Sequence, residues 1–503
     1  MRGTTIKLGL RSRLVIGGRY PRLNKHTSYF HLHLFPPPPW SAGQPQANIY
    51  LGRRAGRLAS IIVSHYSSSR ARHCGMTRST GPEGLEPMPL VIVQGFLGNT
   101  GRWLWGDFER HLNRDLKSTP RRTIFVSVGP VSSLHDRACE LYYSLLGGTV
   151  DYGEEHSTTH KHARYGRNIG LGQYPEWSPS RPLHFLGHSI GGPTIIKLQS
   201  LIKQGHFGPS AHPKMIVSVN AVSAPFRGTQ AVYILGERPD AAPAVNPLSV
   251  GALVGKGVHI LSFLSPLLPR VFDLHGDCRS LTYRDISVLS LLKQLWKSDW
   301  AESRDATPFD VTFQAADERE LMGEGDVEPE TFYQSHVARM TQRSRSDQFG
   351  AHTPSLRHIM SPFLYILSRL LCTFDYSNLQ PPPSFLTQRA PARSVPDGDS
   401  IMGDEYWAND GVVPIFSQWH PLPCGRTRCR HFGPVAPELV EYTDNDYHRD
   451  RVTPRPGIWC VNWQEEDANH MSLLPLWTGT SRQRRFWEQL GRWLLAVDKA
   501  FVH

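Results

Sequence analysis

The fold of this chain is decided by the stretch Leu183-His184-Phe185-Leu186-Gly187-His188-Ser189-Ile190-Gly191-Gly192. A short apolar strand runs into Gly-x-Ser-x-Gly, and apolar residues at helical spacing follow from Ile195 onward. A serine on a sharp strand-to-helix turn needs neighbours without side chains, which Gly187 and Gly191 provide. The turn points the Ser189 hydroxyl outward above a helix N-terminus, which favours negative charge. This context predicts a nucleophile elbow with Ser189 as the nucleophile, and a plain glycine turn is the alternative.

Apolar strands alternate with helical stretches on both sides of this turn. We expect strands at 89–93, 123–128, 215–222, 363–367 and 457–463, and helices at 103–112, 136–146 and around the stripe Phe486, Trp487, Leu490, Trp493 and Leu494. This alternation indicates a mostly parallel sheet with helices on both faces, which is the α/β class.

Three segments interrupt the alternation. Residues 226–300 are apolar and helical, which predicts a helical insertion that is either buried in the core or a mobile lid. Residues 151–181 and 315–357 are polar and are expected to be loops, and residues 376–400 form a Pro-rich exposed loop.

The net charge of +11 is concentrated at the start of the chain. Residues 1–82 contain 13 of the 55 Lys and Arg and no Asp or Glu, so residues 83–503 carry 42 basic and 44 acidic side chains. The expected hydrolase domain, 83–503, is therefore near neutral and gives no indication of nucleic-acid binding. Residues 1–82 fit a disordered extension, a targeting segment, or an over-long gene model with Met76 as the true start.

The sequence predicts neither a membrane-spanning segment nor a disulfide framework. No run of 18 apolar residues occurs, so we expect no transmembrane segment. No secretory signal is evident, and cytoplasmic and mitochondrial locations stay open. Seven cysteines, an odd number at low density, imply no disulfide framework. Cys424 and Cys429 could bridge a small loop, and their spacing without a second pair is poor support for zinc.

A serine nucleophile needs a histidine to take its proton and a carboxylate to orient that histidine. In α/β-hydrolases the acid and then the histidine follow the serine along the chain. Asp410, in Asn-Asp-Gly-Val-Val, lies in a turn before an apolar pair, although such a turn is also a common structural feature. His470 is the first histidine after the last expected strand. We therefore predict Asp410 as the acid and His470 as the base.

The oxyanion of an ester intermediate needs backbone N–H donors. One is expected from Ile190, which follows the nucleophile, and the other from the loop after the first strand. Gly95 lets the backbone approach closely there, and Phe96 is the predicted donor, with Leu97 as the neighbouring alternative.

From about Pro89 onward the chain resembles the large zinc-containing bacterial lipases of staphylococci and thermophilic bacilli. The agreement is dense in Val128-Gly129-Pro130-Val131-Ser132-Ser133, Asp136-Arg137-Ala138-Cys139-Glu140, Gly147-Gly148-Thr149-Val150-Asp151-Tyr152-Gly153 and His162-Ala163-Arg164-Tyr165-Gly166-Arg167. The resemblance implies an α/β-hydrolase fold, hydrolysis of triacylglycerols or other esters, a lipid or ester substrate met at a lipid–water interface, and a helical lid. The segments around Asp410 and His470 resemble the family's acid and base segments.

The same resemblance implies a structural zinc ion held by Asp136, His156, His162 and Asp305. The residues give weaker, independent support, because His156, His160 and His162 form a dense cluster and His/Asp sets suit tetrahedral Zn²⁺. The alternative interpretation is that these histidines lie in a solvated polar loop and bind no metal. His160 is expected to be a neighbour of the ligands rather than a ligand.

The chain departs from the family at its calcium site. The family uses a Glu two residues after the catalytic histidine and an Asp further on, and Ser472 and about Trp477 stand there here. Ca²⁺ requires several oxygen ligands, so this site is expected to be absent. A short-chain esterase and a non-catalytic hydrolase-like binding protein are the competing functions.

Overall fold

The computed structural model describes residues 86–98, 101–117, 119–269, 273–343, 352–387, 403–432 and 454–502. The expectations for residues 1–82 lie outside this range. A seven-stranded sheet, in which every neighbouring pair is parallel, organises the described part of the chain. Its strands, in spatial order, are β10 (Cys429–Phe432), β11 (Trp459–Glu466), β7 (Phe332–Arg339), β6 (Ile216–Val222), β5 (Leu183–His188), β1 (Leu90–Val93) and β2 (Thr123–Phe125).

Helices cover both faces of this sheet, as the strand pattern predicted. In β1, Val91 and Val93 point into the apolar cluster that includes α3 (Leu134–Leu146) and α5 (Gly191–Lys203). Leu90 and Ile92 point the other way, against α2 (Phe108–Leu112) and α14 (Ser481–Val502). Successive side chains of a strand face opposite sides, and β1, which is buried on both faces, is apolar throughout.

The C-terminal helix α14 is fastened to the sheet by a buried polar network as well as by its apolar stripe. Asp498, fully buried on α14, accepts from Arg121 Nη2 at 2.6 Å and pairs with His184 Nε2 of β5 at 2.9 Å. These hydrogen bonds, from the Arg121 guanidinium and the His184 imidazole, compensate for the cost of burying the Asp498 carboxylate.

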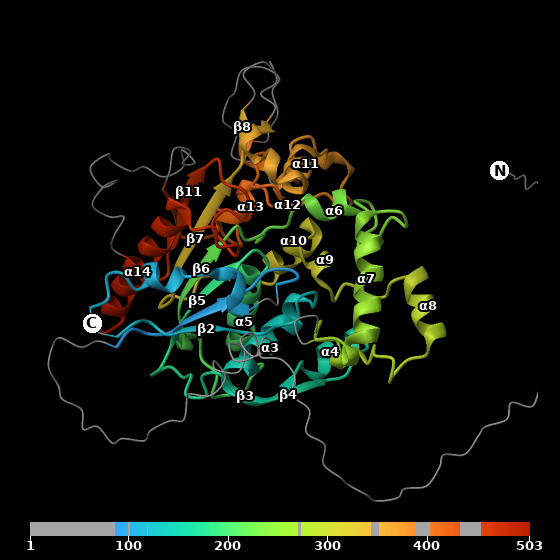
Figure 1. The fold of residues 1–503 in the computed structure, drawn as a ribbon, viewed down its shortest axis with the longest axis horizontal. Helices are drawn as coiled ribbons and strands as arrows, with labels where there is room; N and C mark the ends of the chain where they lie inside the picture. The colour runs from blue at the N-terminus through green and yellow to red at the C-terminus, as the bar shows by residue number, and fades with distance from the viewer. Residues whose placement is uncertain are drawn as a thin grey trace, which may run out of the picture. The chain divides into compact units, whose positions relative to one another are not determined.

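The insertion after β6 is helical, as predicted. It contains α6 (Ala231–Leu235), α7 (Val250–Leu264) and α8 (Val288–Trp296), and α7 and α8 run side by side (Figure 1). Within the described residues, one helical stretch, Val250–Leu267, is long and apolar enough to cross a membrane by length and composition. The buried residues of α7, among them Val258 and His259, face the protein, and His259 Nε2 lies 2.8 Å from Ser298 Oγ.

The prediction of a polar loop at residues 315–357 is wrong, because this segment contains the central strand β7. Its middle residues, Gln334, Ser335 and His336, are polar and buried, and Ser335 has two hydrogen-bond partners. Ser335 Oγ donates to the Trp419 carbonyl at 2.6 Å and accepts from Trp459 Nε1 at 2.7 Å. Such bonds offset the cost of burying polar groups, so hydropathy did not reveal the strand.

Two other elements differ from the prediction. The expected strand at 363–367 is part of a helix, α11 (Pro362–Leu371), which begins at a proline and buries Leu367 and Leu371, one turn apart. The expected loop at 151–181 contains α4 (Glu154–His160) and β4 (Tyr165–Leu171), and β4 pairs antiparallel with β3 (Gly147–Asp151).

The remaining elements are short and lie between those already named. They are η1 (Gly101–Trp105), η2 (Pro213–Met215), η3 (Ser265–Leu267), η5 (Asp277–Arg279), α9 (Thr307–Asp310), α10 (Phe313–Leu321), β8 (Thr341–Arg343), β9 (His352–Pro354), η6 (Leu356–Met360), η7 (Tyr376–Asn378), α12 (Ser384–Thr387), η8 (Asp404–Tyr406) and α13 (Ile415–Trp419).

Candidate functional site

Ser189 lies at the sharp turn between β5 and α5. Its φ of 54° is in the left-handed region, and its N–H donates to the Val222 carbonyl of the adjacent strand at 2.9 Å. A Cβ on Gly191 would collide with the Val93 carbonyl, and one on Gly187 with the backbone of Gly192. The two glycines therefore allow the close approach of strand and helix that holds Ser189 in a strained conformation.

Asp410 and His470, which are 60 residues apart in the chain, are in direct contact. His470 Nδ1 lies 2.9 Å from Asp410 Oδ2, and the His470 N–H donates to the Asp410 carbonyl at 2.8 Å. The other carboxylate oxygen of Asp410 accepts from the N–H groups of Val412 and Val413. Because a carboxylate only accepts, Nδ1 carries the proton in this pair and Nε2 of His470 is left as a base.

His188, the residue before Ser189, has a positioning contact that the sequence reasoning missed. Its Nε2 lies 3.0 Å from the His470 carbonyl oxygen. Burial, with a contribution from His470, lowers the pKa of His188 to about 3, so its imidazole is neutral at ordinary pH. Since a carbonyl accepts, Nε2 must hold the proton, and the elbow thereby holds the backbone of His470.

Phe96 and Ile190 both border Ser189. Leu97, the alternative to Phe96, donates its N–H to the Pro130 carbonyl at 2.9 Å. Within the part of the chain that the structure describes, the N–H groups of Phe96 and Ile190 have no such acceptor. These two N–H groups are therefore the ones available to an oxyanion.

Ser189, Phe96 and Ile190 line one end of an apolar cavity of about 180 Å³. Its walls come from the start of α7 and from the segments around α6 and α9, including Val250, Val254, Trp300 and Val311. Glu237 is the one acidic residue in this lining. Burial, and then the charge of Glu302, raise the pKa of Glu237 to about 8. The cavity suits an aliphatic chain attached to a carbonyl carbon at Ser189.

Arg137 is a second residue that the sequence reasoning missed, although it lies within a segment on which the resemblance rests. It is fully buried on α3 and donates to three acceptors: the Gln94 carbonyl, the Gly129 carbonyl and Thr194 Oγ1. Gln94 precedes the Phe96 turn, and Thr194 lies in the first turn of α5. One guanidinium thus links the loop that contains Phe96 to the first turn of α5, the helix that follows Ser189.

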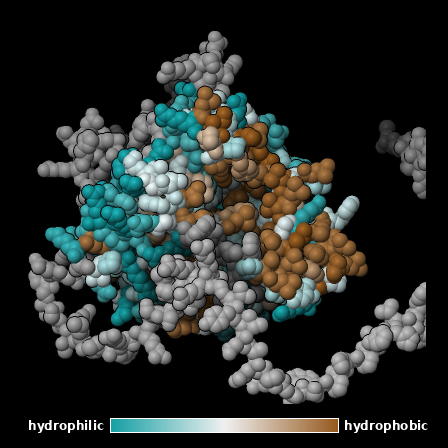
Figure 2. All heavy atoms as spheres, viewed as in Figure 1, coloured by the Kyte–Doolittle hydropathy of each residue, from teal (hydrophilic) through white to brown (hydrophobic). Residues whose placement is uncertain are grey.

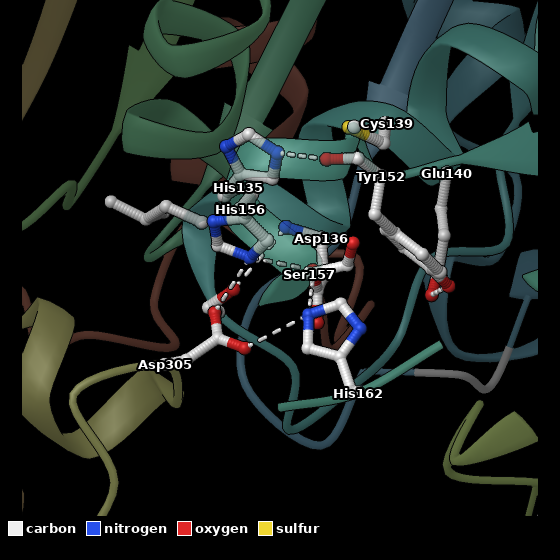
Figure 3. Close-up of polar contacts among 12 residues, drawn as sticks. His135, Asp136, Cys139, Glu140, Tyr152, His156, Ser157, His162 and Asp305 are labelled. Carbon is white, nitrogen blue, oxygen red and sulfur yellow. Dashed lines mark hydrogen bonds and ion pairs between the residues drawn. The ribbon is translucent and has the colours of Figure 1, made fainter. Parts of the chain in front are cut away.

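The four predicted metal ligands converge on one point about α3 and α4 (Figure 3). Asp136 comes from α3, His156 from α4, His162 from the turn after α4, and Asp305 from the segment before α9. His156 Nε2 lies 3.3 Å from Asp136 Oδ1 and 3.2 Å from Asp305 Oδ1, and His162 Nε2 lies 3.4 Å from Asp305 Oδ2.

These distances fit a shared metal ion. Tetrahedral N and O ligands with bonds of about 2.0–2.1 Å lie about 3.3 Å apart. The buried ligand atoms Asp136 Oδ1, His156 Nε2, His162 Nε2 and Asp305 Oδ1 have no hydrogen-bond partner of good geometry in the structure. His162 Nδ1 lies 2.9 Å from the Ala163 carbonyl, a contact that leaves Nε2 with its lone pair toward the cluster.

The electrostatics of this cluster are strongly perturbed. Burial, and then repulsion by Asp305, raise the pKa of Asp136. Burial opposes protonation of His156, yet its close contacts with the carboxylates of Asp136 and Asp305 raise its pKa to about 9. Arg279 Nη2 also contacts Asp305 Oδ2, at 2.5 Å, and offsets part of the negative charge. His160 is outside the ligand set, and its ring lies 4.6 Å from that of His156.

The two positions that replace the family's calcium carboxylates have other contacts. Ser472 Oγ donates to Asn469 Oδ1 at 3.0 Å and so closes the turn that contains His470. Trp477 packs against Gly106 and donates its N–H to the Leu104 carbonyl.

Comparisons with known proteins agree on one family. A model of the family described as "Lipase-like, C-terminal domain" matches residues 86–361. Lipase of Staphylococcus epidermidis is 33% identical over 439 residues, which cover 82% of this chain and 54% of that protein. Lipase 1 of Staphylococcus aureus is 33% identical over 442 residues, with 82% and 55% covered. The chain thus spans about half the length of the curated relatives it matches, and the resemblance to staphylococcal lipases is confirmed.

Solved structures support the fold. The crystal structure of Staphylococcus hyicus lipase superposes with a TM-score of 0.59 at 21% identity, covering 85% of this chain and 99% of that one. EstA from Clostridium botulinum gives 0.54 at 24% identity, with 84% and 89% covered. The parallel sheet predicted from the strand pattern and the α/β-hydrolase fold implied by the family resemblance are both confirmed.

Proposed function

Because this chain belongs to the family of lipase-like C-terminal domains, we propose that it hydrolyses carboxylic esters with aliphatic acyl chains, triacylglycerols above all. One observation carries the proposal. Ser189, at a φ of 54°, opens into an apolar cavity beside the N-terminus of α5, and the hydrogen-bonded pair Asp410–His470 is tied to the same turn through His188.

The proposed reaction uses these groups in sequence. Ser189 Oγ attacks the ester carbonyl carbon while His470 Nε2 takes the hydroxyl proton, and Asp410 orients the resulting imidazolium. The N–H groups of Phe96 and Ile190 stabilise the tetrahedral oxyanion. His470 then gives its proton to the departing alcohol, which leaves an acyl ester on Ser189. Water, deprotonated by His470, attacks that ester, releases the acid and restores Ser189.

Access to the cavity is proposed to depend on an apolar surface. Exposed aliphatic and aromatic side chains gather on α7 and α8 and on η6 and α11, and Figure 2 shows them as extended apolar areas. Trp296 of α8 is 93% exposed and Met360 of η6 is 87% exposed. Exposed apolar patches of this size are typical of surfaces that bind apolar partners. A lipid–water interface is such a partner, and it also contains the substrates with aliphatic chains that we propose.

The proposed cofactor is a structural Zn²⁺ at Asp136, His156, His162 and Asp305. A bound zinc ion would cross-link three distant segments and stabilise the fold. None of the steps above requires a metal ion, because the serine, the histidine and the two N–H groups complete the reaction.

The direct test uses p-nitrophenyl esters of increasing acyl length with the wild type and Ser189→Ala. We expect turnover in the wild type to rise toward longer chains, and the variant to lose about 10⁴-fold or more with an unchanged circular dichroism spectrum. A phosphonate ester should label Ser189 alone, as read by peptide mass. Near-normal hydrolysis by Ser189→Ala would refute the proposal, and activity on the shortest esters alone would favour a short-chain esterase.

A second measurement tests the interface. Trp296→Ser should lower the rate on emulsified triacylglycerol while leaving the rate on a soluble butyrate ester unchanged, because Trp296 is exposed and is not among the residues that line the cavity at Ser189. Equal loss on both substrates would contradict a role in interface binding.

A further inference from the structure

A second cluster of metal-ligating side chains lies near the edge of the sheet, apart from the site described above. His420, Cys424, Cys429 and His431 each direct one ligand atom into a common space, with all four atoms within 4.8 Å of one another. His420 follows α13 directly, and Cys429 and His431 belong to β10. His420 is buried and the other three are half-buried.

The backbone explains why these residues meet. Cys429 and His431 are two positions apart on β10, so their side chains leave the strand on the same face. The parallel pairing of β10 with β11, in which Cys429 lies beside Trp459 and His431 beside Val461, fixes this register. The connection from α13 folds back over that face and brings His420 and Cys424 to it.

The interatomic distances match a single tetrahedral ion. Cys424 Sγ lies 3.6 Å from His420 Nε2 and 3.5 Å from His431 Nε2. Zinc bonds of about 2.3 Å to sulfur and 2.0–2.1 Å to nitrogen, at a tetrahedral angle, place sulfur and nitrogen ligands about 3.6 Å apart. Neither cysteine is in a disulfide in the structure.

The orientation of His420 is also that of a metal ligand. Its Nδ1 contacts the Leu422 carbonyl at 2.5 Å, so Nδ1 carries the proton. The unprotonated Nε2 then faces the two sulfur atoms. Ligating histidines are commonly fixed in this way, by a hydrogen bond from the second ring nitrogen to a carbonyl.

From this geometry we propose that His420, Cys424, Cys429 and His431 bind a second, structural Zn²⁺. Two thiolates and two imidazoles in a tetrahedral arrangement favour zinc over the harder cations. Four protein ligands leave no open position for substrate, so the site is closed and its role is structural. The ion would fasten the end of α13 to the edge strand β10.

A zinc ion at this site would also affect Asp410, the acid of the proposed triad. The turn that contains Asp410 leads directly into α13, and Gln418 of α13 donates to the Val413 carbonyl at 3.0 Å while accepting from the Ala338 N–H. The zinc ion would therefore stabilise the segment that presents Asp410. The proposal does not depend on ester hydrolysis and is tested without it.

The first experiment measures metal in the full-length protein purified in reductant. We expect the mercurial p-hydroxymercuribenzoate to release about one zinc ion per chain from the wild type, because it blocks thiolate ligands, and none from Cys424→Ser/Cys429→Ser. Cys460→Ser removes another half-buried thiol, from the neighbouring strand β11, and should release zinc as the wild type does. Mercurial release that is the same in all three proteins would overturn the proposal.

The second experiment needs no cysteine variant that might fail to fold. Co²⁺ exchanged into the wild type should give the thiolate-to-cobalt charge-transfer band and the intense visible bands of tetrahedral coordination. The same bands should persist in His156→Ala/His162→Ala, in which the other site is removed. A cobalt spectrum without charge transfer, or a Cys424–Cys429 disulfide found by peptide mass in protein isolated without air, would overturn the proposal.

Discussion

Arg137 Nη2 donates a hydrogen bond to the Gln94 carbonyl at 2.6 Å, and this bond joins the helix that contains Asp136 to the turn that contains Phe96. The proposed metal site and the proposed oxyanion donors are thus connected through one buried side chain. Substitutions at Arg137, at the metal ligands and at the residues around Ser189 should therefore change the kinetics, stability or metal content of the protein.

Arg137→Lys should lower kcat/KM for a soluble ester by about 10- to 100-fold. The charge is kept, but an ammonium group cannot reach the three acceptors that the guanidinium fork satisfies, so the Phe96 N–H moves away from the oxyanion. The rate of labelling by a phosphonate should fall in parallel while KM changes little. Arg122→Lys, which alters an exposed arginine bound to the Gln173 carbonyl, is the control. Equal kinetics in both variants would exclude a positioning role for Arg137.

His188→Phe should lower kcat by roughly tenfold, which corresponds to the loss of one hydrogen bond of about 1.4 kcal/mol that aligns the base. The phenyl ring keeps the planar shape of the imidazole but is larger, so the variant also changes the packing at this buried position. Steady-state kinetics and a melting curve separate the two effects. A drop in the melting temperature with unchanged kcat would show that the contact with the His470 carbonyl is structural only.

Glu237→Gln should flatten the pH dependence of stability. The folded-state pKa of Glu237 is raised to about 8 from an ordinary value near 4.5, so the unfolded chain loses its proton first as the pH rises. The wild type should therefore lose stability between about pH 4.5 and pH 8, and the variant, which has no titrating group there, should lose less. Urea denaturation across this range makes the comparison, and parallel curves would contradict the burial of a neutral Glu237.

His156→Ala/His162→Ala should lose about one zinc ion per chain by elemental analysis and unfold at a lower temperature. Per folded molecule, turnover of a soluble ester should be nearly kept, because the proposed reaction has no metal-dependent step. His160→Ala changes a neighbouring histidine outside the ligand set and should retain the metal. Unchanged zinc content in the double variant would exclude this site.

Added calcium should leave both activity and the thermal midpoint unchanged. Ser472 and Trp477 supply no carboxylate at the positions where the family's ligands are expected, and Ca²⁺ needs several oxygen ligands. A rise in the melting temperature with calcium, measured by scanning calorimetry, would point to a site built from other residues.

The sequence by itself determined the elbow and the sheet that holds it. Gly187 and Gly191 identify the turn because no other residue tolerates the close backbone approach there. The strands β1, β5 and β6 can be recognised because they are buried on both faces and most of their residues are apolar. The order of Ser189, Asp410 and His470 along the chain, together with the family resemblance, was enough to predict the triad.

Tertiary structure alone decided what depends on partners distant in the chain. The strand β7 was not predicted because its buried Ser335 is stabilised by hydrogen bonds with Trp419 and Trp459. These two residues are far from Ser335 in the chain, so the local sequence pattern does not show that they meet it. The contacts of Arg137 with Gln94 and of His188 with His470 were not predicted for the same reason, because the partners are distant in the chain. The spacing of Cys424 and Cys429 was poor support for zinc because the other two ligands are imidazoles. Only the return of the chain from α13 to β10 places His420 beside Cys429 and His431, and a coordination shell is defined by distances in space rather than along the sequence.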